Sequence, residues 1–320
     1  MTRIYNLIPD KKINQDTFQN NLKMKWGSFA VDNLPSSIDM RDKMPPVIDQ
    51  EGVGSCVACS LAAAFQYCDP TWVPSKLFIY YNSRLLDNST GRDDGTTISQ
   101  GVNSLYRYGT CSELKWPYLS NKWAVQPTAE CYTEGLEHQT IDYEHIPQTH
   151  LQLKGCLYSG FPFVFGFYVY ESFENSQNTL TGVMTMPAQG EQLLGGHAVV
   201  CVGYDDDRKV WICRNSWGTK WGDNGYFYMP YEYLDSVKNL ASDFWKILKV
   251  ETVDEQRPDV IVPDNNVPIV VNPVINPEPP KKHIPKFKIV PKLKGDVTPE
   301  DVLFNDETNK RKLITKLLSN

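Results

Sequence analysis

Two short segments far apart in the chain carry residue types that could perform nucleophilic chemistry. The first, Gln50–Cys56, ends in a thiol, and the second, Gly196–Ala198 followed by Asn215–Gly218, adds an imidazole and a carboxamide. Only the thiolate form of a cysteine attacks a carbonyl well, and a neighbouring imidazole both stabilises it and returns a proton to the leaving group. These residue types predict hydrolysis through a cysteine nucleophile.

The residues around Cys56 predict a helix that begins at the thiol. The run 56–65 is apolar, rich in alanine and free of Gly and Pro, and Ser55 is a residue type favoured at the N-cap. Cys56 would then lie in the first turn, where free backbone N–H groups and the helix dipole favour an anion.

The base and its supporting groups are expected on strands and a loop. His197 begins an apolar run of small and β-branched residues that indicates a buried strand, and Asn215 directly follows a second such run. A hairpin of these two strands would bring the Asn215 carboxamide onto the imidazole and orient it. Gln50, six residues before Cys56, could donate an N–H to the same point as the Cys56 backbone N–H, which would form an oxyanion hole.

At this point the sequence resembles a known family. The segment 50–60 resembles the nucleophile segment of papain-like cysteine peptidases, and 215–226 is similar to their asparagine motif. His197 is 141 residues and Asn215 is 159 residues after Cys56, against roughly 130–150 in the family. The resemblance extends over about 34–250 and is strongest to the compact branch of bacteria and large DNA viruses.

The resemblance implies an α+β fold with two lobes, in which a helical lobe carries the cysteine, an antiparallel β-barrel lobe carries the histidine, and the active-site cleft lies between them. It implies a peptide or protein substrate, with no cofactor and no metal site. Trp217 is expected to shield the contact between His197 and Asn215 from water and to line the site. Gly95 and Gly196 are expected to bind the substrate, although an ordinary turn glycine remains an alternative for Gly95.

Some positions depart from the family pattern. Val57, Cys59 and Val53 replace the tryptophan, phenylalanine and cysteine that relatives usually have, so a disulfide at Val53 is impossible, and Gly196 stands where aspartate is common. The pair Cys56 and Cys59 also fits a CxxC redox or zinc motif. That alternative lacks a second CxxC or a histidine pair at zinc-finger spacing.

Composition limits the function classes. The chain has 320 residues, is 41% hydrophobic and has a net charge of −6, which argues against general binding of nucleic acid. No apolar run is typical of a signal peptide or long enough to span a membrane, so we expect a protein of the cytoplasm or of a virion, with no membrane partner. In a reducing compartment the eight cysteines are expected to be free thiols.

The pattern along the chain predicts five regions: an N-terminal extension (1–33), the helical lobe (34–126), the β lobe (127–250), an extended Pro-rich segment (251–296) and a C-terminal helix (297–320) that could dock on a partner. The predicted helices cover 75–86, 98–109 and 149–159, and the predicted strands cover 162–170, 197–204, 210–214, 225–229 and 243–250.

The N-terminal extension leaves a second hypothesis open. It is polar, with scattered apolar anchors that include Tyr5, Leu7 and Ile8, and it is far too short for a long helical prosegment. It could still lie across the cleft and inhibit the enzyme within the same molecule. The chain would then be a latent peptidase, or an inactive interaction or structural protein whose cleft is filled by its own N-terminal extension or by its Pro-rich C-terminal extension.

Overall fold

A long central strand, β5 (Leu193–Asp205), organises the part of the chain that carries His197. The computed structural model describes residues 3–9, 25–26 and 33–250. From Gly196 to Tyr204 every residue of β5 is buried, because β4 and β6 pair with it on either side in antiparallel register and helix α2 packs against it. The strand order in the sheet is β1-β3-β8-β4-β5-β6-β7, with β2 beside β5.

The other elements follow the chain on either side of this sheet. The strands are β1 (Lys25–Trp26), β2 (Ser37–Asp39), β3 (Thr140–His145), β4 (Phe163–Tyr170), β6 (Val210–Arg214), β7 (Tyr226–Pro230) and β8 (Ala241–Val250). The α-helices are α2 (Cys56–Cys68), α3 (Lys76–Leu86), α4 (Ile98–Tyr108), α5 (Ala129–Gly135), α6 (His150–Tyr158) and α7 (Ser176–Thr181). Short 3-10 helices include η1 (Arg41–Lys43) and η3 (Glu171–Glu174).

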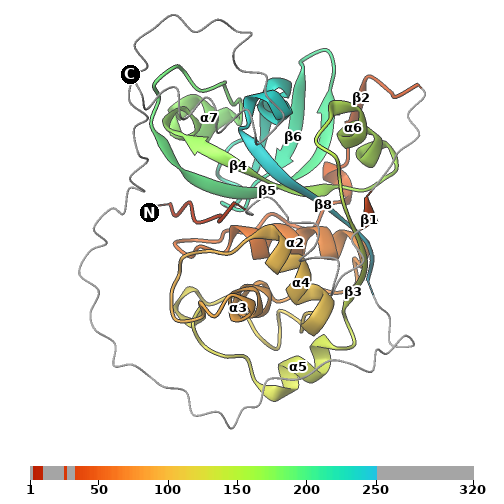
Figure 1. Ribbon diagram of the computed structural model, residues 1–320, viewed down its shortest axis with the longest axis vertical. Coiled ribbons are helices and arrows are strands. Elements are labelled where there is room, and N and C mark those ends of the chain that lie inside the picture. The colour runs from red at the N-terminus through yellow and green to blue at the C-terminus, as the bar shows by residue number, and fades with distance from the viewer. Residues whose placement is uncertain (1–2, 10–24, 27–32, 251–320) are drawn as a thin grey trace, which may run out of the picture. The chain divides into compact units, whose positions relative to one another are not determined.

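Helices α2, α3 and α4 gather below strands β4 and β5 in Figure 1, with α2 next to the sheet. The helix boundaries follow local capping chemistry. The Ser75 hydroxyl accepts the Phe78 N–H at the start of α3, and Gly109 ends α4 in a left-handed conformation, with φ of 62°, that glycine adopts without strain. Residues 56–65 of α2 are all buried, because this helix lies between the sheet and helices α3 and α4.

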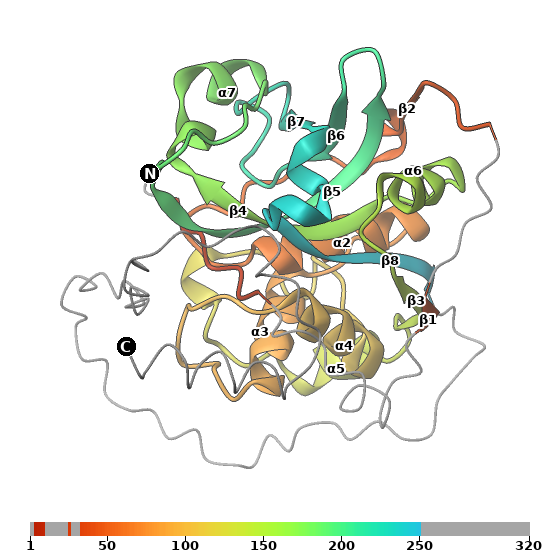
Figure 2. The ribbon, with the colours of Figure 1, turned by 45° about the horizontal axis from the view of Figure 1, so that its top comes forward.

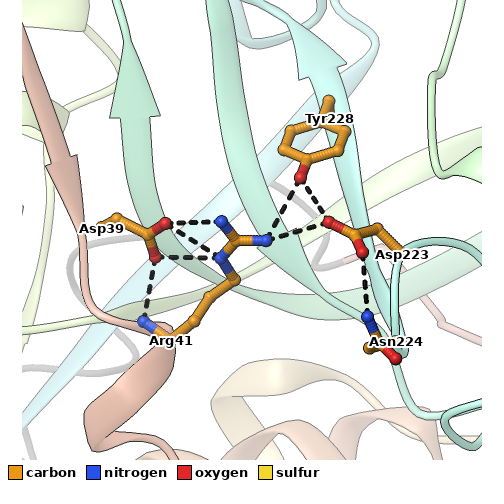
Figure 3. A network of polar contacts seen from close by, with 5 residues as sticks. All are labelled: Asp39, Arg41, Asp223, Asn224 and Tyr228. Carbon is orange, nitrogen blue, oxygen red and sulfur yellow. Dashed lines mark hydrogen bonds and ion pairs between the residues drawn. The ribbon is translucent and has the colours of Figure 1, made fainter.

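A polar network joins the start of the family-like region to the turn before β7 (Figure 3). The Arg41 guanidinium donates to Asp39 at 2.6 and 2.9 Å and to Asp223 at 3.0 Å. The Tyr228 hydroxyl donates to the same Asp223 carboxylate. One cation shared by two carboxylates therefore ties η1 to this turn.

Most predicted elements are confirmed, with differences at their ends and some omissions. The predicted helices 75–86, 98–109 and 149–159 correspond to α3, α4 and α6, and the predicted strands to β4, β5, β6, β7 and β8. The sequence analysis missed β1, β2, β3, α5 and α7. Ser55 is the N-cap of α2, as predicted; its side chain makes no capping hydrogen bond and bonds with the Tyr118 hydroxyl at 2.7 Å.

Two predicted regions, the Pro-rich segment (251–296) and the C-terminal helix (297–320), lie outside the described residues, and the five-region division stays a prediction. Of the helices that the structure describes, none combines the length and the apolar character required to cross a bilayer. All eight cysteines are free thiols.

Candidate active site

The nucleophile candidate Cys56 is the first residue of α2 and is completely buried. Backbone N–H groups of Ala198, Val57 and Cys56 itself lie near its sulfur and favour the thiolate. Burial nevertheless raises the pKa of the Cys56 thiol to about 11, and the nearby Asp93 carboxylate acts in the same direction. Because Ala198 directly follows His197 in β5, the sulfur lies against the strand backbone that carries the predicted base.

The hairpin of β5 and β6 brings His197 and Asn215 together. The His197 Nε2 lies 2.8 Å from the Asn215 Oδ1, and the same oxygen accepts the Ser216 N–H at 2.8 Å. The Trp217 ring stacks on the imidazole, with 4.7 Å between ring centroids and 24° between the planes. The Trp217 side chain therefore covers the His197–Asn215 contact from solvent.

The second ring nitrogen of His197 has no partner. Its Nδ1 is buried and makes no hydrogen bond to any residue that the structure describes. Burial lowers the pKa of His197 to about 4, while the Asn215 hydrogen bond acts in the opposite direction and the Arg3 charge lowers it further. In this state the imidazole and the Cys56 thiol are both neutral around pH 7.

Gln50 is held rigidly at the start of the nucleophile loop, with only 1% of its surface exposed. Its backbone N–H donates to the Ser216 carbonyl at 2.8 Å, and its Oε1 accepts the Ser216 hydroxyl at 2.6 Å. Its Nε2 donates to the Val53 carbonyl oxygen at 3.0 Å, which leaves the second hydrogen of this amide nitrogen available for another acceptor. The sequence analysis missed Ser216, which orients this carboxamide from the asparagine motif.

Residues 3–9 lie between the two walls of the site, and Figure 2 shows this segment in red between the sheet and the helices. Asn6 forms a parallel β-bridge with Gly196, the Leu7 N–H donates to the Gly196 carbonyl at 3.0 Å, and the Ile8 N–H donates to the Thr96 carbonyl at 3.2 Å. A Cβ at Gly95 would lie only 1.6 Å from the Asn6 carbonyl oxygen. Both predicted substrate-binding glycines therefore contact the chain's own N-terminus.

The side chains of this segment fill positions along the site. Leu7 is 6% exposed and lines a small pocket with β4 and β8 residues that include Gly166 and Ala241. Tyr5 contacts His197 and Trp217 edge to face, at centroid distances of 6.3 and 5.9 Å. The segment thus covers the catalytic candidates as well as the cleft walls.

A carboxylate on the loop before Gly95 anchors the nucleophile loop. Asp93 accepts the Gly54 N–H at 3.1 and 3.2 Å and the Tyr80 hydroxyl. Its own carbonyl accepts the Asn6 side chain at 2.6 Å. Asp93 therefore connects the loop that precedes Cys56 with the loop that carries Gly95.

Sequence reasoning missed Asp93 and the contacts of the N-terminal segment. The sequence analysis held that the N-terminal extension could lie across the cleft, and residues 3–9 do so, but nothing in the sequence indicated the individual partners of Tyr5 and Leu7. In the residues that the structure describes, no group of three or more His, Cys, Asp or Glu side chains could hold a metal ion.

Comparisons with known proteins agree with this architecture. The family model described as papain family cysteine protease matches residues 34–241. An uncharacterized peptidase C1-like protein, L477, of Acanthamoeba polyphaga mimivirus is 42% identical over 233 residues, which cover 68% of this chain and 75% of that protein.

Solved structures show the same fold. Xylellain, a cysteine protease from Xylella fastidiosa, superposes with a TM-score of 0.69 at 36% identity and covers 78% of this chain and 96% of its own. The procathepsin B S9 of Trypanosoma congolense shares the fold at 19% identity, with a TM-score of 0.58 and coverage of 72% of this chain and 84% of its own. The predicted α+β papain-like fold is therefore confirmed, and the chain belongs to the papain family of cysteine proteases.

Proposed function

We propose that the chain is a cysteine endopeptidase that is latent while residues 3–9 occupy its cleft. The observation that carries the peptidase is the arrangement around His197. One ring nitrogen contacts Asn215 at 2.8 Å, the other is unpaired among the described residues, and the N–H of the next residue, Ala198, lies near the Cys56 sulfur and favours its thiolate.

The proposed reaction follows from these positions. Cys56 transfers its proton to the His197 Nδ1 and attacks a peptide carbonyl, while Asn215 fixes the ring through Nε2. The Cys56 N–H and the free Gln50 Nε2 hydrogen stabilise the tetrahedral oxyanion. His197 then protonates the departing amine, and water hydrolyses the thioester acyl-enzyme with His197 as the base.

Chain direction supports latency. Since His197 protonates the leaving amine, the leaving half of a substrate belongs on the side of His197 and Trp217, and the acyl half belongs on the side of Gly95. The N-terminal segment has its earlier residue Tyr5 against His197 and Trp217 and its later residue Ile8 against Thr96. It therefore runs opposite to a substrate, and its peptide bonds present the leaving nitrogen on the wrong side.

Electrostatics also support latency. Burial under the segment favours the neutral thiol and the neutral imidazole, and the Arg3 charge opposes the imidazolium further. Because the reactive form of such a site is the ion pair of thiolate and imidazolium, we expect departure of the segment to rehydrate both groups and to remove a nearby positive charge. Displacement of residues 3–9 is therefore the proposed activation step.

The experiment compares Cys56→Ala with Cys59→Ala in a full chain that also carries Leu7→Asp, which removes the buried apolar anchor of residues 3–9 and opens the cleft. Both thiols are buried in α2, one turn apart, so loss of packing alone affects them similarly. Cleavage of fluorogenic peptides and labelling by a thiol-directed epoxide should disappear in Cys56→Ala and persist in Cys59→Ala. Equal activity in the two variants would contradict the assignment.

A second candidate, an inactive interaction protein, is favoured by the same occupied cleft. It predicts that a full chain whose N-terminal segment has been displaced still lacks peptide cleavage, with Cys56 no more reactive than an ordinary exposed cysteine.

A further inference from the structure

The N-terminal segment places a guanidinium in a site made by other parts of the chain. The Arg3 guanidinium lies over the Trp217 ring at 4.2 Å from its centroid, and 5.9 Å from that of Trp221. Its Nη1 donates to the Glu174 Oε2 at 2.5 Å. A planar cation thus contacts an indole face and a carboxylate together, a combination that suits arginine better than lysine.

The groups around Arg3 are held by the core. Phe173, the residue before Glu174 in η3, is 1% exposed and packs at 5.6 Å from both Trp217 and Trp221. The two tryptophan rings meet edge to face at 5.0 Å. Since these contacts do not involve Arg3, the indole faces and the Phe173 side chain next to Glu174 keep their positions when the segment leaves.

The negative charge of the Glu174 carboxylate favours a cation at this site. The Glu174 carboxyl is about two-thirds buried, with 31% of its side-chain surface exposed, so it loses hydration that Arg3 replaces. Burial raises the pKa of Glu174, and the Arg3 charge and hydrogen bond counteract this. Displacement of Arg3 would leave a partly dehydrated carboxylate beside two aromatic faces.

The position of the site relates it to catalysis. Trp217 stacks on His197 and contributes a face to Arg3, so the cation site adjoins the side of the cleft that takes the leaving half of a substrate. Resting on the proposed peptidase function, we propose that Glu174, Trp217 and Trp221 bind an arginine side chain of the substrate, within the first three residues after the scissile bond. In the latent chain Arg3 occupies the site that the substrate arginine takes after activation.

The test uses the full chain carrying Leu7→Asp, which expels the segment from its apolar pocket. Paired peptides differ only in having arginine or citrulline at the first, second or third position after the scissile bond. Citrulline keeps the shape of arginine and lacks its charge. At one position the arginine peptide should be cleaved with a kcat/KM about tenfold higher, equivalent to about 1.4 kcal/mol.

Two matched variants test whether Glu174 causes the preference for arginine over citrulline. Glu174→Gln should bring the arginine-to-citrulline ratio close to one, whereas Glu171→Gln, which removes the same charge from the exposed start of the same 3-10 helix, should leave it unchanged. A ratio near one in the parent chain, or a ratio that Glu174→Gln does not reduce, overturns the cation site. Efficient cleavage without an arginine preference would thus refute this inference and leave the peptidase intact.

A binding measurement tests the cation site when no cleavage is observed. If neither peptide is cleaved and Cys56 is not labelled, the peptidase proposal fails. The same two peptides are then titrated onto the Leu7→Asp chain, with tryptophan fluorescence as the signal. Binding about tenfold tighter for the arginine peptide, lost in Glu174→Gln, supports the site independently of catalysis, and equal affinities overturn it.

Discussion

Leu7 is the residue whose replacement tests most directly whether the N-terminal segment controls the active site. Its side chain is 6% exposed and packs on Gly166 of β4, where it lines a small pocket with residues of β4 and β8. Burial of a leucine side chain contributes about 1.5–3 kcal/mol, and a carboxylate in the same pocket would cost more because it would lose its hydration. Leu7→Asp should therefore destabilise the closed state by at least about 2 kcal/mol.

The expected result is a change in labelling rate. If reagents reach Cys56 only after the segment leaves, at least about 2 kcal/mol corresponds to at least about 30-fold faster labelling by an epoxide or by iodoacetamide, since about 1.4 kcal/mol is tenfold. Peptide cleavage should increase in parallel, because the same opening admits the substrate.

Ile8→Asp is the matched control. Ile8 is the next residue, its side chain is 42% exposed, and its hydrogen bond to Thr96 uses only the backbone. This variant should change the labelling rate by less than about threefold, because little apolar surface is lost. Equal labelling rates for Leu7→Asp and Ile8→Asp, with unchanged urea unfolding midpoints, would refute the reasoning.

Three further predictions follow from the same contacts. At pH 7 iodoacetamide should label Cys56 more slowly in the intact chain than in the Leu7→Asp chain, and the difference should shrink as the pH rises toward about 11, because burial in the closed state raises the pKa of the thiol to about that value and the closed state loses stability as the pH approaches it; a ratio of the two rates that does not change with pH would contradict this. Asp93→Ala should unfold about 1–3 kcal/mol more easily in urea and lower kcat about tenfold in the Leu7→Asp chain, since the Gly54 N–H and the Tyr80 hydroxyl lose their acceptor; unchanged kcat would exclude a positioning role. Arg41→Ala should lower the free energy of unfolding by about 1 kcal/mol, more than Arg41→Lys, because only the guanidinium spans both carboxylates; equal urea midpoints for the two variants would contradict this.

Much of the site could be predicted because its signals are local in sequence. A cap at Ser75 and a glycine at Gly109 are read within one helical turn, and the apolar runs before Asn215 and after His197 indicate strands by composition alone. Motif spacing then linked Cys56, His197 and Asn215 through the family resemblance. The partner of the Ser55 side chain could not be predicted in this way, because the Tyr118 hydroxyl that bonds with it lies 63 residues away in the sequence.

The sequence by itself determined the set of chemical groups, since thiol, imidazole and carboxamide are properties of residue types. Only the tertiary structure decided what each group faces: Leu7 in a pocket between β4 and β8, Asp93 on the Gly54 N–H, and Arg3 beside Glu174, 171 residues away. Such contacts join segments with no local relation, and their partners depend on how the sheet and helices pack. The protonation of Cys56 and His197 was decided there too, because burial, which lowers the local dielectric, shifts both pKa values toward the neutral forms.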